Sequence, residues 1–569
     1  MSRQLLNVPT ACVEEAMEAL VMGDPAVRRL EGYNVIVRAN LDGGKVAVVS
    51  GGGSGHEPSH GGWVAHGMLS AAVCGSVFAS PSTKSILAAI MHVTGAAGCL
   101  VIIKNYTGDR LSFGMACEQA KAAGLAVEMV VVGDDCALAG RGSGIAGRRG
   151  IAGTCFVHKI AGAAAEGGAS LAEVTAAAKA AADALGSMGV ALRSCNLPGA
   201  PREERIDAGK MEVGLGIHGE PGALTTELVA ADEVVAKLVE FIYASGYLSL
   251  SPGDQVALLV NNLGNTTGLE MSVVTRAAFK LLEGPKYGLQ VARLLSGSFM
   301  TALDMAGVSI TILKLTDASL TLLDAPTTAR LWPRSSLPGR DGVVAAPVLP
   351  EVTASTIGGP QLNPADQAAL KAAIAAAASA ICSAEPRLTA WDEISGDGDC
   401  GTTLAAGAKA VLEDLPTYPL ASPANVARAV SVSTERSMGG SSGALYSIFL
   451  NAVAAALAKA PAITSKAAVD AFAAGVAAIS KYGGAGAGQR TMLDALIPAA
   501  RAMESATDQP LAAVLKVGAE AAVAGAEATK AMQASAGRAS YVPFEKMKDV
   551  PDPGAMAVSI WFGAAANAS

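Results

Sequence analysis

The pattern of apolar residues changes its period about two-thirds of the way along this 569-residue chain, and that change constrains the fold more than any other feature. Residues 1 to about 335 alternate apolar runs of strand length, such as Val46–Ser50 and Leu100–Lys104, with helical patterns such as Ser170–Leu185. This alternation predicts an α/β domain with a mostly parallel sheet, in which ligands bind beyond the carboxyl ends of the strands. Beyond Asn363 strand patterns almost vanish and Ala-rich helical patterns follow one another, which predicts an all-α bundle of about eight helices.

A proline-rich stretch separates the two halves. Five prolines occur between Trp332 and Leu362 without amphipathic periodicity, which is typical of an inter-domain linker. We therefore expect an α/β domain at 1–335, a linker at 336–362 and a helical domain at 363–569, with a boundary between two α/β lobes near 195–205. The helices expected in the second half are 365–384, 402–413, 423–436, 443–459, 465–481, 491–505, 510–534 and 553–567.

Composition excludes several classes of function. A net charge of −8 gives no general attraction for nucleic acid or for acidic lipid head groups. Nine cysteines without a CxxC pair indicate reduced thiols rather than a disulfide framework. The sequence shows no basic-plus-apolar signal at its start and no run of about 20 apolar residues. We expect a cytoplasmic protein with neither a nucleic-acid nor a membrane partner.

Three segments of the α/β half combine glycine with polar side chains. Gly51–Pro58 reads GGGSGHEP, and consecutive glycines let backbone N–H groups approach an oxygen-rich ligand closely. Lys104–Asp109 reads KNYTGD, in which the carboxylate can accept a hydroxyl proton and the lysine can hold an oxygen. Gly214–Gly222 places His218 among glycines, open to a ligand. In isolation the first two are also ordinary turns, and a lone histidine is more often structural.

An acidic cluster stands in the helical half. Asp392, Asp397 and Asp399 lie close together in sequence, the last two within GDGDCG, and such an oxygen-rich group suits Mg²⁺ with phosphate oxygens completing its shell. An EF-hand is excluded because its required glycine and terminal glutamate are out of register, whereas a solvated acidic turn remains an alternative. All six histidines lie at or before His218, so chemistry in this half must depend on metal, carboxylates and backbone donors.

Three further loops of the helical half precede helical patterns. They contain MGGSSG at Met438–Gly443, RTMLD at Arg490–Asp494, and GRASY with PDPG between Gly537 and Gly554. Free N–H groups and hydroxyls at the start of a helix form an anion site. Plain helix capping is the alternative for each of these loops.

Taken together and in order, these segments resemble the dihydroxyacetone kinase family, in its ATP-dependent form with both domains on one chain. The resemblance rests on GGGSGHEP, KNYTGD, GLGIHGEPG, GDGDCG, MGGSSGALY, RTMLDAL and GRASY…PDPG, and it covers essentially the whole chain. It implies phosphorylation of dihydroxyacetone, and of glyceraldehyde, by ATP with two Mg²⁺ ions in a homodimer. One departure is Gln489, where the family usually has aspartate before Arg-Thr-Met.

The resemblance also implies roles for individual residues. His218 bonds covalently to the substrate carbonyl carbon as a hemiaminal, His56 stabilises the adduct and Asp109 acts as base toward the terminal hydroxyl. The substrate is held by Gly53, Ser54, Gly55, His56, Lys104 and Asp109. Asp392, Asp397 and Asp399 bind the metal ions. The nucleotide is bound by Asp399, Cys400, Gly401, Thr402, Ser441, Ser442, Gly443, Gly483, Arg490, Thr491, Met492, Arg538, Asp552, Pro553 and Gly554.

Two other classes of protein compete with a kinase. A phosphotransferase-type protein takes phosphate from a phosphohistidine donor, but its two halves are normally separate chains. A sugar-sensing binding protein would keep the glycine-rich segment and could lose His218 or the aspartates, whereas both are present here. A side activity as an FAD-AMP lyase (cyclising) in the nucleotide site stays open, as does the preference between dihydroxyacetone and glyceraldehyde.

Overall fold

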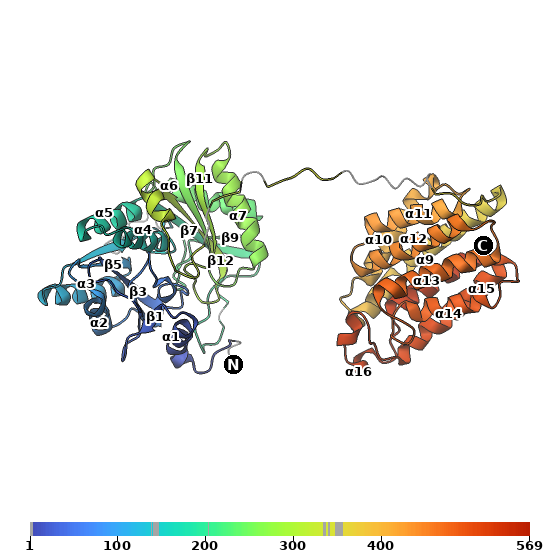
Figure 1. Ribbon diagram of the computed structural model, residues 1–569, viewed down its shortest axis with the longest axis horizontal. Helices are drawn as coiled ribbons and strands as arrows, with labels where there is room; N and C mark the ends of the chain where they lie inside the picture. The colour runs from blue at the N-terminus through green and yellow to red at the C-terminus, as the bar shows by residue number, and fades with distance from the viewer. Residues whose placement is uncertain are drawn as a thin grey trace. The chain divides into compact units, whose positions relative to one another are not determined.

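The structure is a computed structural model that describes residues 4–137, 139, 147–202, 204–333, 337–339, 342–347 and 357–569. Contacts between residues divide it into two compact units, Met1–Val344 and Ala345–Ser569, and Figure 1 labels many of their elements. The first unit is α/β and the second is helical, which confirms the predicted order of fold classes. Positions 336, 340, 341 and 348–356 of the expected linker lie outside the described residues.

The first sheet of the α/β unit has six strands in the order β1-β2-β4-β3-β5-β6. Its strands are β1 (Val27–Arg29), β2 (Val35–Arg38), β3 (Ala47–Ser54), β4 (Ala71–Val77), β5 (Cys99–Lys104) and β6 (Val127–Val132). The four strands β4, β3, β5 and β6 run parallel, as the apolar runs predict, and β1 and β2 add an antiparallel edge.

The second sheet also has six strands, in the order β11-β10-β12-β7-β8-β9. Its strands are β7 (Leu185–Arg193), β8 (Lys210–Val213), β9 (Leu224–Glu227), β10 (Gln255–Asn262), β11 (Gln290–Gly297) and β12 (Ala306–Lys314). Only β10 and β11 pair in parallel, so the expectation of a mostly parallel sheet is wrong for this sheet. The boundary expected near 195–205 is also wrong, because the chain changes sheet between β6 and β7 and β7 already belongs to the second lobe.

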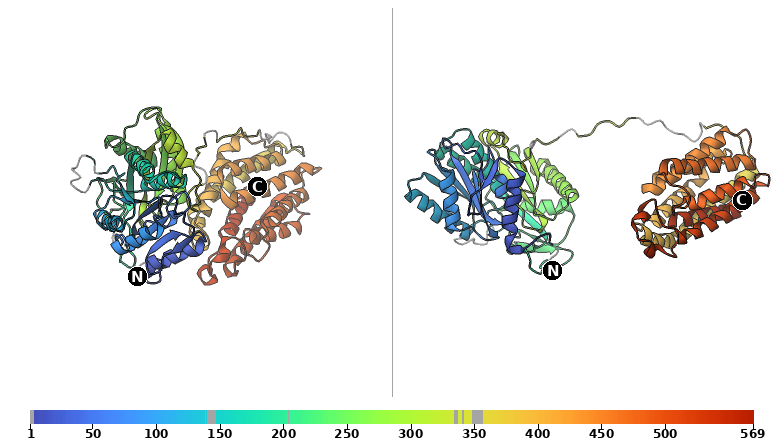
Figure 2. Two further views of the ribbon diagram at one scale, coloured as in Figure 1. Left: turned by 60° about the vertical axis from the view of Figure 1, so that its left-hand side comes forward. Right: turned by 60° about the horizontal axis from the view of Figure 1, so that its bottom comes forward.

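Helices cover both faces of the first sheet, and α6 and α7 pack on the second sheet (Figure 2). Along β3, Ala47 and Val49 belong to the core with α2 (Thr83–Val93) and α3 (Thr107–Ala122), while Val48, with Val46 just before the strand, belongs to the core with α4 (Thr154–Glu166). In β10, alternate residues likewise face α4 or the pair α6 (Ala231–Ala244) and α7 (Gly268–Glu283). Strands buried on both faces explain the continuous apolar runs in the sequence. The remaining helices of this unit are α1 (Cys12–Gly23), α5 (Leu171–Asp183) and α8 (Asp317–Asp324).

All eight helices expected in the second unit are present. They are α9 (Pro364–Ser395), α10 (Cys400–Asp414), α11 (Pro423–Ser437), α12 (Gly440–Lys459), α13 (Ser465–Gly483), α14 (Leu493–Glu504), α15 (Leu511–Ala528) and α17 (Pro553–Asn567), with a one-turn α16 (Phe544–Met547). The first helix continues past its expected end at residue 384 and contains Pro386. This continuation brings Asp392 into the last turns of α9, beside the start of α10.

Two helices of this unit, α9 and α12, are long and apolar enough to cross a membrane by length and composition alone. The sequence favours a packed bundle helix here, because the stretch Ala368–Cys382 of α9 is apolar mostly through alanine and carries Lys371. Within the unit, α9 packs against α10 and α17, and α12 packs against α11 and α13. Helices of a bundle pass the same test of composition, so the finding is weak evidence for a span.

Candidate active site

His218 is held by a carboxylate from its own loop. The loop joins β8 to β9, and His218 donates its backbone N–H to Glu220 Oε2 at 2.5 Å while its Nδ1 lies 2.7 Å from Glu220 Oε1. Burial raises the pKa of Glu220, but the hydrogen bond and charge of His218 outweigh burial and lower that pKa to about 2. Glu220 is therefore an ionised acceptor, so His218 carries a hydrogen on Nδ1 and presents Nε2 to the site.

Aromatic rings surround the exposed side of His218. The centroids of Phe78, Tyr106 and His56 lie 4.9, 4.9 and 5.0 Å from that of His218, each ring meeting it edge to face. Such rings fix an imidazole in orientation while keeping the space around it apolar. Nε2 of His218 is thus set among aromatic rings.

His56 faces His218 directly. The two Nε2 atoms are 3.2 Å apart, and Nδ1 of His56 donates to the carbonyl oxygen of Thr301 at 2.8 Å. The Thr301 carbonyl fixes the hydrogen of His56 on Nδ1 and Glu220 fixes that of His218 on Nδ1, so a hydrogen bond between the two Nε2 atoms forms only if one ring takes up a second proton. Burial, together with the charges of Lys104 and His218, holds the pKa of His56 well below its usual value.

Asp109 and Lys104 meet beside this pair. Asp109 lies in the first turn of α3 and accepts a 2.5 Å hydrogen bond from Ser80 at Oδ1. Burial raises its pKa although Lys104 opposes the shift, and burial lowers the pKa of Lys104 although Asp109 opposes it. A carboxylate with a raised pKa is a stronger base once it is ionised.

The glycine-rich segment is mostly strand, not the free turn considered as an alternative. Gly51, Gly52, Gly53 and Ser54 belong to β3 and are buried. A side chain on Gly53 would collide with the backbone of Phe78 and Ala79. Glycine is therefore required there for close packing against β4 and the residues after it, while the Ser54 hydroxyl donates to the Gly75 carbonyl at 2.7 Å. Gly55, with a φ of 99°, turns the chain toward His56.

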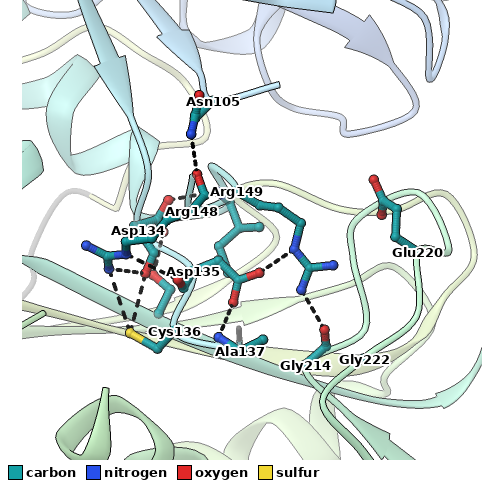
Figure 3. A network of polar contacts seen from close by, with 12 residues as sticks. Asn105, Asp134, Asp135, Cys136, Ala137, Arg148, Arg149, Gly214, Glu220 and Gly222 are labelled. Atoms are coloured by element: carbon teal, nitrogen blue, oxygen red, sulfur yellow. Dashed lines mark hydrogen bonds and ion pairs between the residues drawn. The ribbon is translucent and has the colours of Figure 1, made fainter. Parts of the chain in front are cut away.

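A network of arginines and aspartates supports the histidine loop (Figure 3). Arg149 donates to Asp135 Oδ2 at 2.6 Å and to the carbonyl oxygen of Gly214 at 2.7 Å. Gly214 begins the loop with a φ of 79°. The adjacent Arg148 instead donates to the backbone carbonyls of Asp134, Asp135 and Leu185. Arg149 thus ties the His218 loop to the segment after β6.

The second unit gathers the three aspartates. One oxygen each of Asp392, Asp397 and Asp399 lie within 4.8 Å of one another, a spacing that fits a divalent cation. The backbone N–H groups of Asp399 and Cys400 each donate to Asp392 Oδ2 at 3.0 Å, which fixes the turn into α10. Arg538 forms an ion pair with Asp397, so the GRASY segment lies against the cluster.

A further pair of loops meets beside α14 and α17. Arg490 is buried, has a φ of 61° and donates to the Val550 carbonyl at 3.0 Å. A Cβ on Gly554 would lie 3.5 Å from Met492 Cβ, so RTM and PDPG are neighbours. Asp552 caps α17 through a 2.8 Å bond from the Ala555 N–H, and burial raises its pKa to about 6.

Several of the other expected nucleotide residues serve helix packing as well. Gly401 lies in the first turn of α10, where a side chain would collide with α9, and Gly443 lies against Met438. Thr402 donates to the Asp399 carbonyl at 2.9 Å, and burial with the nearby aspartates raises the pKa of Cys400 to about 12. The remaining members are exposed Ser441 and half-buried Ser442 in the first turn of α12, Gly483 at the end of α13 and Pro553 at the start of α17.

Sequence reasoning missed several residues that build the first site. Glu220 stands two positions after His218 in a quoted motif, so its polarity was a usable signal. Ser80, Phe78 and Thr301 come from segments without such a signal and reach the site only through the fold. Gln489 accepts from the Gly486 N–H at 2.7 Å through its side-chain oxygen, so it serves its own loop.

The chain thus combines two kinds of domain. One is an α/β domain that carries the His56–His218 pair, and the other is a helical domain that carries the cluster of three aspartates. The Dak1 domain family matches residues 18–331 and the DAK2 domain family matches residues 394–567. The chain therefore belongs to the dihydroxyacetone kinase family.

Individual relatives cover nearly the whole chain. A Solanum lycopersicum protein, whose name proposes a 3,4-dihydroxy-2-butanone kinase, is 48% identical over 100% of this chain and 98% of its own length. The Mus musculus protein named triokinase/FMN cyclase is 43% identical over 99% of this chain and 98% of its own. The crystal structure of the C. freundii dihydroxyacetone kinase with AMP-PNP and Mg²⁺ superimposes with a TM-score of 0.74, at 37% identity and full coverage of both chains.

Proposed function

We propose that this protein is an ATP-dependent dihydroxyacetone kinase, also active on glyceraldehyde, that holds its substrate covalently on His218. The observation that carries the proposal is the pairing of His218 Nδ1 with Glu220 at 2.7 Å, which leaves Nε2 as the reactive atom among aromatic rings. An imidazole nitrogen adds to a ketone or aldehyde carbon, whereas glycerol has no such carbon. Selection against glycerol then follows from reactivity as well as from shape.

The protons and charges balance in the proposed capture step. The Nε2 lone pair of His218 forms a bond to the carbonyl carbon, and the π electrons of the carbonyl group move to its oxygen. Nε2 of His56, which lies 3.2 Å from Nε2 of His218, must first take up a proton, and it passes this proton to that oxygen, which becomes a hydroxyl. The His218 ring is left with a positive charge, which Glu220 balances at Nδ1.

Asp109 is proposed as the base for the terminal hydroxyl that receives the phosphoryl group. Its Oδ1 is held by Ser80, and Lys104 stands close enough to affect its pKa. Ionised Asp109 takes the hydroxyl proton as the oxygen attacks, while Gly53, Ser54, Gly55 and Lys104 hold the substrate. Positioning and charge neutralisation supply most of the catalysis in phosphoryl transfer.

The helical unit, proposed to begin at residue 363, would hold ATP and two Mg²⁺ ions, which supply the γ-phosphoryl group and neutralise its charge. Asp392, Asp397 and Asp399 fit this role because three carboxylate oxygens already lie within 4.8 Å of one another. The nucleotide would lie against Cys400–Thr402, Ser441–Gly443, Gly483, Arg490–Met492, Arg538 and Asp552–Gly554. We also propose that the protein is cytoplasmic and forms a homodimer; light scattering of the purified protein tests the dimer.

The deciding assay supplies ATP and Mg²⁺ and measures phosphorylated product with dihydroxyacetone, glyceraldehyde, 3,4-dihydroxy-2-butanone or glycerol as the acceptor. A separate arm supplies FAD and measures its cleavage to test cyclase activity. We expect phosphorylation of the carbonyl compounds and none of glycerol. The 3,4-dihydroxy-2-butanone arm tests the substrate named for the Solanum lycopersicum relative, and the FAD arm tests the second activity named for the Mus musculus relative. Product from glycerol alone, or from no acceptor, would refute the proposed function.

A further inference from the structure

A second buried histidine, His60, borders the first site without a role in the steps above. It is 4% exposed, and its ring stands edge to face with that of His158, the centroids 5.3 Å apart. The hydroxyl of Ser50 joins the two rings, 3.4 Å from His60 Nδ1 and 3.0 Å from His158 Nε2. Nε2 of His60 is buried and has no hydrogen-bond partner in the part of the chain that the structure describes.

The donor and acceptor roles around Ser50 show which nitrogen of His60 carries the hydrogen. Ser50 donates its single hydrogen to the Ile102 carbonyl oxygen at 2.7 Å, so it meets both imidazoles as an acceptor. Nδ1 of His60 is therefore the protonated nitrogen. Burial, followed by the charges of Lys104, His158 and His56, holds the pKa of His60 well below its usual value, so the ring is neutral. Its Nε2 is a bare acceptor.

This acceptor faces the same space as the proposed base. A Cβ on Gly52 would lie 3.6 Å from His60 Nε2, 3.3 Å from Asp109 Oδ2 and 3.6 Å from Lys104 Cε. The three groups therefore converge on the position that a side chain on Gly52 would take and that glycine leaves unfilled. Buried polar atoms are almost always paired, so an unpaired acceptor at this place indicates that a ligand supplies the missing donor.

We propose that His60 Nε2 accepts a hydrogen bond from the substrate hydroxyl that Asp109 does not take. Dihydroxyacetone has two hydroxyl donors, and two acceptors, Asp109 Oδ2 and His60 Nε2, border the space beside Gly52. His60 is then a specificity-determining residue that selects ketones with a hydroxyl on both arms. The inference rests on the proposed function, because it takes dihydroxyacetone as the ligand.

Three substitutions separate this role from support of the fold. His60→Asn keeps a donor near the place of Nδ1, where Ser50 accepts, and has no atom at the place of Nε2. His60→Gln brings an amide oxygen toward the place of Nε2. His60→Phe keeps the ring shape without an acceptor and replaces His60→Asn if the asparagine variant does not fold.

The test compares the KM for dihydroxyacetone with the competitive inhibition constant of hydroxyacetone, which lacks one of the two hydroxyls. Loss of a hydrogen bond to a buried acceptor should raise the KM in His60→Asn about 10-fold or more, and should raise the inhibition constant of hydroxyacetone less than about 3-fold. We expect His60→Gln to recover part of the affinity for dihydroxyacetone only. Thermal unfolding of each variant checks that it is folded.

An equal rise for both compounds would show that His60 only supports the fold, and unchanged constants would show that it meets no hydroxyl. Either result overturns the inference. Failure of the wild-type protein to phosphorylate dihydroxyacetone would instead overturn the proposed function, so the two failures are distinguishable.

Discussion

The Nε2 atoms of His56 and His218 face each other at 3.2 Å, each in a ring whose Nδ1 is committed to an acceptor. Glu220 takes the Nδ1 hydrogen of His218 and the Thr301 carbonyl takes that of His56. A hydrogen bond between the two Nε2 atoms needs one added proton, which would lie where the oxygen of a captured carbonyl group would need it. In the proposed mechanism this pair would link substrate capture to proton supply.

Replacing His56 by asparagine should slow capture more than it weakens nucleotide binding. Asparagine can still donate to the Thr301 carbonyl, but it has no atom at the place of Nε2. Loss of one group that stabilises a developing oxyanion typically costs about 100- to 1000-fold in rate. Rapid quench followed by intact-mass measurement gives the rate of adduct formation, and an unchanged rate would remove His56 from the capture step.

Arg149→Lys should lower kcat about 10-fold or more while leaving the protein folded, because one ammonium group cannot replace a planar guanidinium that bonds Asp135 and the Gly214 carbonyl together (Figure 3). The matched control is Arg148→Lys, whose side chain donates to backbone carbonyls outside the His218 loop. Steady-state kinetics and thermal unfolding of both variants make the comparison. Equal losses of activity would mean that Arg149 has no special connection to the loop.

Asp397→Asn and Asp399→Asn should each weaken Mg²⁺-dependent nucleotide binding at least about 10-fold, because each removes an anionic oxygen ligand. Glu393→Gln is the control, since Glu393 neighbours Gly398 but lies outside the cluster. Calorimetric titration of ADP with and without Mg²⁺ gives the affinities, and chelation by EDTA should abolish turnover of the wild-type protein. Unchanged Mg²⁺-dependent affinity in both aspartate variants would refute the metal assignment.

His158 should make the α/β unit sensitive to acid. Burial, with the charge of Lys104, lowers its pKa to about 3 from an ordinary value of 6.5. Between pH 3 and pH 6.5, His158 is therefore protonated in the unfolded chain but neutral in the folded protein. The stability that neutral His158 contributes is fully present above pH 6.5 and is lost toward pH 3, at up to about 1.4 kcal/mol per pH unit.

The variant His158→Gln can still donate to Ser50 but cannot titrate. Its free energy of unfolding, measured in denaturant between pH 8 and pH 5, should fall less on acidification than that of the wild-type protein. Parallel curves for the two proteins would contradict a neutral, buried His158.

Local sequence patterns predicted much of the fold because burial on two faces produces continuous apolar runs. The run at Val127–Val132 coincides with β6, and all eight long helices of the second unit were expected. Strand order in the second sheet was not predictable, because Ser309–Leu315 is equally apolar whether it pairs in parallel or, as β12 does, antiparallel. The end of α9 was missed because proline usually ends a helix, whereas Pro386 is accommodated within this one.

The candidate site was predictable where function needs unusual local sequence. Glycines beside His56 and His218, and three aspartates near one turn, stand out without any fold. Ser80 and Thr301 do not, since they reach Asp109 and His56 from distant parts of the chain. His60 Nε2 lacks a hydrogen because the Ser50 hydroxyl donates to the Ile102 carbonyl and not to His60, and no sequence pattern encodes that choice.

The most direct test of the account is carbon NMR of the protein mixed with dihydroxyacetone labelled with ¹³C at its carbonyl carbon. Bonding to His218 Nε2 converts that carbon from a planar carbonyl to a tetrahedral centre, whose signal should appear at a distinct shift bound to the wild-type protein and be absent with His218→Ala. ADP affinity should be unchanged in the variant, because the acidic cluster belongs to the other unit. A bound substrate that keeps only its carbonyl signal in the wild-type protein, or a tetrahedral signal that survives in His218→Ala, would contradict covalent capture on His218.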